Sequence, residues 1–272
     1  MSTILVFGAS GAVGRFLRPR LAPETRLLAV SRSPRPGWIT GDLNDPAARW
    51  PLAEFVISLG PLDAFGAWLE RTPHATLRRI VAISSMSAQS KRESPDPGER
   101  ALAQRLRDAQ AALAAAAGAR GIAWTILQPT LIYGAGNDQS LAPIARFARR
   151  WRVLPVPLGA SGLRQPVHAA DLAAACAAVL ENPVTFGKTY ELGGGERLTF
   201  AAMIWRLRKT VPGFVLPLPV PISALWALAR SGRIAPGPLA RLRLPLIADN
   251  NAAIRDFGFA PGPFRADDVL PR

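Results

Sequence analysis

The sequence predicts an α/β fold, a doubly wound parallel sheet with a small, discontinuous C-terminal lobe. Three observations predict it. A glycine-punctuated turn follows the first apolar run, strand and helix signals alternate over the first two thirds of the chain, and proline and glycine become frequent after about residue 130. With 272 residues, 49% of them apolar, the chain is long enough to bury a sizeable core.

The first strand is expected over residues 3–7, and Gly8-Ala-Ser-Gly-Ala-Val-Gly14 leads from it into a helical pattern over 12–21. Such a turn lets the main chain approach a diphosphate, and the N–H groups that open a helix favour its negative charge. The spacing Gly-x-x-Gly-x-x-Gly departs from the usual Gly-x-Gly-x-x-Gly. Its position between strand and helix predicts a dinucleotide site, and an ordinary turn without a ligand is the alternative.

The remaining elements follow in alternation. Further strands are expected over 26–30, 54–59, 79–84 and 122–128, and helices over 64–71, 99–118 and 169–181. We predict a nucleotide-binding domain over 1–195, interrupted near 133–165 by segments of the lobe, and the lobe itself over 196–272. The segment Lys91–Gly98 is expected to be an exposed loop at the rim of a site.

Composition excludes several classes of protein. The net charge is +14, but only three of the 33 basic residues are lysines, the arginines are scattered apart from a group at 146–152, and no basic-aromatic motif for nucleic acid occurs. Two histidines, His74 and His168, and one cysteine, Cys176, lie far apart, which argues against a transition-metal site and excludes an internal disulfide. No signal peptide precedes the first strand, so a cytoplasmic protein is expected.

An apolar stretch over 214–229 is broken by prolines and therefore does not predict a transmembrane helix. Arginines follow this stretch, and the segment 214–243 therefore has two interpretations. In the first, the apolar stretch packs on the lobe. In the second, it forms an amphipathic surface with a basic rim for a peripheral contact with the inner membrane or a partner subunit.

Six sequence blocks follow one another in order: Gly8-x-x-Gly11-x-x-Gly14, Gly41-Asp-Leu-Asn-Asp45, Val56-Ile-Ser-Leu-Gly60, Ile83-Ser-Ser-Met-Ser87, Leu127-Gln-Pro-Thr-Leu-Ile-Tyr-Gly134 and Pro166-Val-His-Ala-Ala-Asp171. With these blocks the chain resembles the extended short-chain dehydrogenase/reductase family, in its epimerase/dehydratase branch, which has a Rossmann fold. Further segments are Gln165-Pro-Val-His168, Glu181-Asn-Pro183, Gly187-Lys-Thr-Tyr-Glu-Leu-Gly-Gly194 and the proline-rich tail. They are similar to an atypical subgroup that includes the nucleotide-binding accessory subunit of respiratory complex I.

The resemblance implies a nicotinamide dinucleotide. An acidic residue at the end of the second strand usually holds the ribose 2′-hydroxyl of NAD, and this chain has Ser31, Arg32 and Arg35 instead. These residues suit a 2′-phosphate, which favours NADP(H) over NAD(H). The other cofactor-binding residues that it implies are Gly8, Ser10, Gly11, Ala12, Val13, Gly14, Asp42, Leu43, Leu59, Gly60, Ser84, Gln128 and Pro129.

Active members of the family pair a tyrosine with a lysine four residues on, so that the tyrosine acts as acid and base. Aligning the helix that ends at Gly118 puts Leu102 and Leu106 at those two positions, and no Tyr-x-x-x-Lys occurs in the chain. Ser85 matches the family's serine. The candidates for catalysis are therefore Ser85, Ser87, Tyr133 and the Arg105/Arg107 pair, and Arg164 is the candidate for a substrate diphosphate.

His168 and Asp171 belong to a block that the family places at the lobe junction, and Asp171 is expected to cap the helix that begins near Leu172. Without a Gly-x-Ser-x-Gly elbow, a hydrolase is not expected. Two functions stay open. The chain reduces or isomerises a small ligand with NADP without the usual pair, or it binds NADP as a non-catalytic accessory or sensor. A sugar-nucleotide epimerase comes third, because epimerisation depends on the absent tyrosine.

Overall fold

A computed structural model describes residues 2–71, 75–136, 138 and 140–270. The predicted fold is confirmed. A seven-stranded, fully parallel sheet has the order β11-β6-β5-β4-β1-β2-β3. Its strands are β1 (Thr3–Phe7), β2 (Arg26–Ser31), β3 (Ile39–Thr40), β4 (Phe55–Ser58), β5 (Arg79–Ile83), β6 (Ala123–Pro129) and β11 (Lys188–Leu192).

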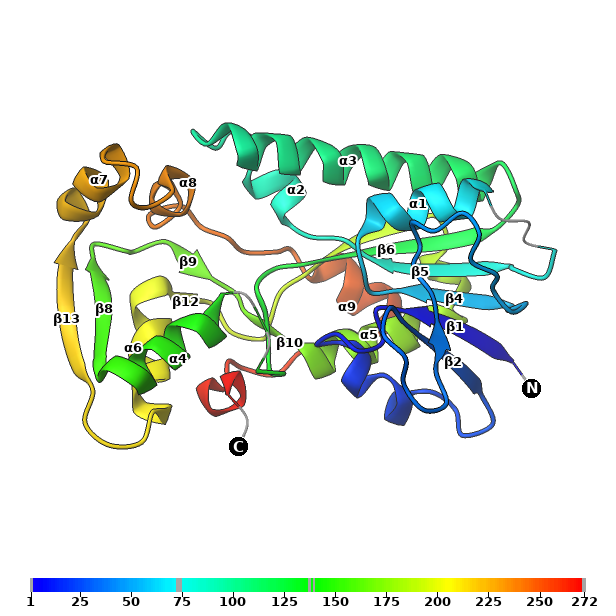
Figure 1. Cartoon of the computed structure of the whole chain (residues 1–272), viewed down its shortest axis with the longest axis horizontal. Coiled ribbons are helices and arrows are strands. Elements are labelled where there is room, and N and C mark those ends of the chain that lie inside the picture. Colours follow the sequence, from blue (N-terminus) through cyan, green and yellow to red (C-terminus); the bar gives the residue numbers. More distant parts are fainter. Residues whose placement is uncertain (1, 72–74, 137, 139, 271–272) are drawn as a thin grey trace.

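Helices cover both faces of this sheet (Figure 1). On one face lie α1 (Leu62–Arg71), α2 (Ser87–Ser90) and α3 (Pro97–Gly118). On the other lie α5 (Ala169–Leu180) and α9 (Asn251–Phe257). Because the sheet is covered on both sides, its central strands read as continuous apolar runs, and these runs made the strands visible in the sequence.

The helix expected over 12–21 is wrong. Two 3₁₀ turns, Gly14–Phe16 and Arg18–Arg20, take its place. Pro19 explains the difference, because it has no N–H for an α-helical bond to Arg15 and disfavours the α conformation at Arg18. Asp171 does not cap α5 either. The helix begins at Ala169, and His168 caps it by accepting a hydrogen bond from the Ala170 N–H to Nδ1 at 3.0 Å.

A second body of smaller elements lies beside the sheet, at the end of the long axis away from the N-terminus (Figure 1). Its three two-stranded sheets pair β7 with β10, β9 with β12 and β8 with β13. The elements are β7 (Ile132–Tyr133), α4 (Leu141–Trp151), β8 (Val153–Leu158), β9 (Leu163–Arg164), β10 (Val167–His168), β12 (Leu198–Thr199), α6 (Phe200–Thr210), β13 (Leu216–Pro221), α7 (Ile222–Arg230) and α8 (Pro236–Ala240).

The chain returns to the main sheet after this body. Ala253 of α9 and Phe259 join the core beneath the sheet, together with α5. Two more 3₁₀ turns lie at Pro183–Thr185 and Ala266–Val269. The division at residue 195 therefore stays a prediction. His74 lies outside the described residues. Within the part of the chain that the structure describes, no helix is long and apolar enough to cross a bilayer.

Candidate functional site

The glycine turn after β1 is built for a close approach between two strand ends. Gly8 has φ +75°, and a Cβ on it would lie 2.9 Å from the main-chain carbon of Leu59 and 3.1 Å from the Gly60 nitrogen. The turn closes with a hydrogen bond of 2.9 Å from the Gly11 N–H to the Gly8 carbonyl. β1 and β4 are neighbours at which the strand order reverses, which is where open α/β sheets bind ligands.

A cavity of about 290 Å³ opens at this point between the ends of β1, β2 and β4. Nine of the predicted cofactor residues line it: Gly8, Ser10, Gly11, Ser31, Arg32, Asp42, Leu43, Leu59 and Gly60. The structure therefore brings together residues that stand up to 52 positions apart in the sequence. Arg35 does not line this cavity, because its guanidinium lies 5.2 Å from the ring centroid of Trp38.

The wall made by the end of β2 carries polar groups and no acidic residue. Ser31 is buried, and its Oγ accepts a hydrogen bond from the Ser33 N–H at 3.2 Å. Arg32 is exposed at the mouth. Asp42 lies beside them, because it follows β3, the strand that pairs with the end of β2. Its Oδ1 accepts hydrogen bonds from the Asn44 N–H at 2.9 Å and from Asn44 Nδ2 at 3.0 Å, so that this carboxylate stabilises its own turn.

A larger cavity of about 820 Å³ lies on the other side of the glycine turn. Ala12 lines it, and the preceding residue, Gly11, lines the smaller cavity, so the turn separates the two. The main sheet contributes Pro129 and the residues after β5, and the smaller body contributes the opposite wall. Polar residues on its lining are Ser85, Ser87, Gln89, Ser90, Lys91, Thr130, Asp138, Ser140, Arg164 and Arg241.

The two predicted serines both line the large cavity. They follow β5, which ends at Ile83, and Ser87 begins α2. Ser85 Oγ accepts a hydrogen bond of 3.1 Å from the Ser87 N–H. This bond leaves the Ser85 hydroxyl proton available for another acceptor.

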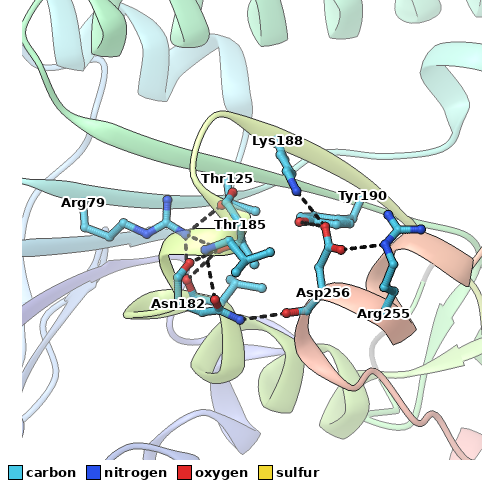
Figure 2. A network of polar contacts seen from close by, with 10 residues as sticks. Arg79, Thr125, Asn182, Thr185, Lys188, Tyr190, Arg255 and Asp256 are labelled. Carbon is cyan, nitrogen blue, oxygen red and sulfur yellow. Dashed lines mark hydrogen bonds and ion pairs between the residues drawn. The ribbon is translucent and has the colours of Figure 1, made fainter.

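Neither tyrosine that the structure describes reaches this cavity. Tyr133 is buried, donates from its hydroxyl to the Pro263 carbonyl at 3.3 Å and accepts from the Arg265 N–H at 3.0 Å. Tyr190 of the edge strand β11 donates to Asp256 Oδ2 at 2.8 Å (Figure 2). Burial raises the pKa of both phenols. The structure therefore does not bring Tyr133 to the place where the sequence expected it to act.

Other predicted residues stabilise the frame around the site. Gln110 of α3 donates to Ser84 Oγ at 2.7 Å, and Gln128 donates to Gln110 Oε1 at 2.7 Å, so Ser84 and Gln128 point toward α3. Neither lines the two cavities. Val13 is buried in the core beneath the sheet, and Gly14 begins the first 3₁₀ turn.

Arg164 lines the large cavity but is held by main-chain carbonyls. It donates to the carbonyls of Leu244 at 2.9 Å and Arg241 at 2.7 Å, and burial lowers its pKa to about 10. Its guanidinium thus connects β9 to the segment after α8. The structure gives it this anchoring contact, and its role toward a substrate diphosphate stays a prediction.

A charged cluster that the sequence did not reveal lies beside Arg164. Glu99 of α3 accepts from Arg241 at 2.7 Å and from Ser94 Oγ at 2.7 Å, and Lys91 Nζ lies 3.3 Å from it. Burial alone would raise the pKa of Glu99, but hydrogen bonds from Arg241 and Ser94 and the charges of Arg241 and Lys91 hold it at about 2. Two cations share one carboxylate, so the cluster leaves positive charge at the cavity. Two features of the sequence drew attention to Lys91: it is one of three lysines, and it lies in the loop expected at the rim of a site.

Asp138 is a second residue that the sequence reasoning missed. Its Oδ1 accepts hydrogen bonds from the N–H groups of Ser140 at 3.0 Å, Leu141 at 2.6 Å and Ala142 at 3.1 Å, which caps α4. Among the described residues, the other oxygen, Oδ2, is buried without a hydrogen-bond partner. The same described ranges hold no group of His, Cys, Asp and Glu suited to a metal ion.

Comparisons with known proteins agree with this architecture. No family model matches the chain. A curated relative, NADH dehydrogenase [ubiquinone] 1 alpha subcomplex subunit 9, mitochondrial, from Arabidopsis thaliana, is 30% identical over 155 residues. The match covers 50% of this chain and 38% of that protein, so the chain spans well under half of that relative's length. The chain is thus a distant homologue of this complex I subunit.

Two solved structures share the fold over nearly the whole chain. UDP-glucuronic acid 4-epimerase from Bacillus cereus, solved with NAD, has a TM-score of 0.74 at 16% identity and covers 98% of this chain and 96% of that one. RMD from Pseudomonas aeruginosa, solved with NADPH, has a TM-score of 0.69 at 17% identity, with 99% and 97% covered. The chain therefore has the extended short-chain dehydrogenase/reductase fold.

Proposed function

We propose that this chain binds a nicotinamide dinucleotide across the glycine turn, with the adenosine half in the smaller cavity and the nicotinamide half in the larger one. The observation that carries the proposal is the pair of cavities on the two sides of the glycine turn, one lined by Gly11 and the other by Ala12. A dinucleotide needs two nucleoside sites joined by a diphosphate, and a turn that cannot accept a Cβ at Gly8 brings the main chain close to that diphosphate.

The residues at the end of β2 favour NADP(H). A 2′-phosphate at the mouth of the smaller cavity would meet Arg32 and the buried Ser31, with no carboxylate from β2 opposing it. Related folds hold either cofactor, because the Bacillus cereus epimerase was solved with NAD and the Pseudomonas aeruginosa protein with NADPH. The choice therefore depends on the side chains of this chain.

Calorimetric titration of the chain with NADPH and NADH tests this proposal. We expect NADPH to bind at least about tenfold more tightly, because a guanidinium–phosphate contact contributes about 1.5–3 kcal/mol. Arg32→Ala should remove that advantage and leave the affinity for NADH unchanged, whereas Arg26→Ala, an exposed arginine on the same strand, should change neither. Equal or tighter binding of NADH by the wild type would contradict the choice of NADP(H).

The large cavity supports a reductase or isomerase acting on a small ligand without the Tyr/Lys pair. The bound dinucleotide would supply or accept a hydride, and the protein would orient the ligand. Ser85, with its hydroxyl proton available, would hold the ligand's oxygen. Lys91, shared with Glu99, would place positive charge near developing negative charge.

A non-catalytic role as an accessory or sensor protein is the second candidate. Two observations favour it: the absence of any tyrosine among the residues that line the large cavity, and the distant homology to a subunit of respiratory complex I. Assays of NADPH oxidation with carbonyl, enone and quinone substrates separate the two candidates. Tight binding without turnover of any of them would favour the accessory role.

A further inference from the structure

The charge of this protein is divided between its two bodies. Residues 139–170 and 197–248 form most of the smaller body, and they contain 13 of the 33 lysines and arginines and none of the 19 aspartates and glutamates. The rest of the chain holds 20 basic residues against 19 acidic ones. These two segments therefore carry +13 of the net charge of +14.

Exposed apolar side chains gather at one end of this body. Nine of the 13 large apolar side chains that are exposed in the described residues belong to the two acid-free segments. Five of them stand within residues 147–153 and 205–216, which we call the lobe tip. They are Phe147, Trp151, Trp205, Phe214 and Leu216, with Phe214 72% and Trp151 60% exposed.

The lobe tip is one connected surface. The ends of α4 and α6 meet there with the starts of β8 and β13, at the lower left of Figure 1. Arg152 donates from its side chain to the Pro212 carbonyl, and its own carbonyl accepts from the Leu216 N–H at 2.8 Å. Arg208 lies 5.6 Å from the ring centroid of Trp205 and 5.9 Å from that of Phe214, so aromatic rings and guanidinium groups alternate.

Interactions within the chain account for the charged residues of the lobe tip but not for its exposed aromatic residues. Cations in the last turn of a helix interact favourably with its dipole, and this accounts for Arg149 and Arg150 on α4 and for Arg208 and Lys209 on α6. Arg206 is paired with Glu196 at 2.5 Å. The dipole does not account for exposed tryptophan and phenylalanine side chains beside the cations, and such a combination marks a surface that meets a partner.

Strand addition is excluded as the way in which a partner covers this region. The Leu216 N–H points to β8, so in alternation Pro217, Pro219 and Pro221 face the open edge of β13 without a donor. Pro155 and Pro157 stand in the same way on the open edge of β8. A second copy of this chain is disfavoured as well, because the two basic surfaces would repel each other.

We propose that the lobe tip docks on the surface of an anionic lipid bilayer, with its aromatic side chains at the level of the headgroups and its arginines on the lipid phosphates. Aromatic rings beside basic residues fit the chemistry of that interface, and no matching acidic partner surface with a defined shape is needed. The contact shares only Phe214 to Leu216 with the one expected over 214–243. Ile222, Leu225, Trp226 and Leu228 of α7 are half-buried in the lobe and do not belong to the lobe tip.

Cosedimentation of the full chain with lipid vesicles tests the proposal, and it needs no dinucleotide. We expect binding to vesicles with roughly 30% phosphatidylglycerol in phosphatidylcholine, no binding to phosphatidylcholine alone, and loss of binding at about 0.5 M salt. The double variants Trp151→Ser/Phe214→Ser and Arg149→Gln/Arg150→Gln should each weaken binding by about tenfold or more. Their side chains are exposed, so the fold should tolerate the changes.

Two exposed residues of the other body provide matched controls. Leu52→Ser removes an apolar side chain that is 68% exposed, and Arg26→Gln removes an exposed charge. Neither should change binding. Three outcomes would overturn the proposal: no binding of the wild type to anionic vesicles at low salt, equal weakening by the control variants, or binding that survives Trp151→Ser/Phe214→Ser unchanged.

Discussion

At the scale of single residues, Gly8 combines a positive φ with a close approach to a neighbouring strand end. Its φ of +75° and the 2.9 Å between a Cβ and the Leu59 main chain are separate obstacles to any side chain. Gly37 has the same φ of +75°, but nothing lies within 4 Å of a Cβ there. At Gly37 only the backbone conformation opposes a side chain, whereas at Gly8 a close contact opposes it as well. The two glycines thus separate backbone strain from a steric role in the site.

We expect Gly8→Ala to lower the affinity for NADPH by about tenfold or more, because the turn must move away from β4 and from the diphosphate. Gly37→Ala should cost about 1 kcal/mol of stability through its backbone and leave the affinity unchanged. Calorimetric titration and thermal unfolding of both variants check this. Equal affinities for the two variants would contradict the proposed role of Gly8.

Arg79 shows a buried charge in a structural role (Figure 2). It is 2% exposed, and it donates to the last carbonyls of α5, at Leu180 (2.9 Å) and Val179 (2.7 Å), and to the hydroxyls of Thr125 and Thr185. Burial lowers its pKa to about 10, so it remains charged at neutral pH. A cation at the C-terminus of α5 also meets the negative end of the helix dipole.

Arg79→Ala should lower the free energy of unfolding by about 3 kcal/mol, because it removes four buried hydrogen bonds and takes the side-chain donor away from the Leu180 carbonyl. Its neighbour provides the control: Arg78 is 67% exposed in a pair with Glu54, and Arg78→Ala should cost less than about 1 kcal/mol. Urea denaturation measures both. Similar losses for the two variants would mean that the network around Arg79 contributes little.

At the scale of elements, α3 is connected to the smaller body through Glu99. Asp96 caps the helix by accepting from the Gly98 N–H at 2.8 Å, which sets Glu99 in its first turn. Arg241, which follows α8, reaches back over 142 positions to this carboxylate. A single ionised group therefore connects a helix of the main sheet to the wall of the large cavity.

This connection should depend on pH. The folded-state pKa of Glu99, about 2, lies below its ordinary value of 4.5, so its stabilisation is present above pH 4.5 and is lost as the pH falls toward 2. Glu99→Gln should cost on the order of 2 kcal/mol at pH 7 and much less near pH 2. Urea denaturation at several pH values checks this, with Glu54→Gln as a control from an exposed pair. A loss that is the same at every pH would contradict the assignment.

Five strands of the main sheet, β1, β2, β4, β5 and β6, were predicted from the sequence to within one or two residues, because buried parallel strands are continuous apolar runs. The two strands at the ends of the sheet, β3 and β11, were not predicted. β8 and β13 were not predicted, because prolines alternate with apolar residues in both and a proline usually argues against a strand. In the site, the glycines and the end of β2 were predictable as local motifs. Lys91 and Arg241 were not, because their meeting at Glu99 depends on how the smaller body folds back.

At the scale of the whole molecule, the two bodies carry different chemistry. The nearly neutral body holds the smaller cavity and most of the residues proposed for the dinucleotide, and the basic body forms the outer wall of the large cavity. The lobe tip lies at the end of the long axis away from the N-terminus (Figure 1). In the proposed orientation on a bilayer, the glycine turn would stand away from the lipid surface and open to the cofactor in solution.

The prolines on the open edges of β8 and β13 have a consequence for solubility. A pair of apolar strands with unpaired edges ordinarily templates the growth of cross-β fibrils, in which every added chain extends the hydrogen-bonded ladder. Here the ladder ends at residues that have no hydrogen to donate. The prolines therefore oppose the addition of further chains to the open edges of β8 and β13.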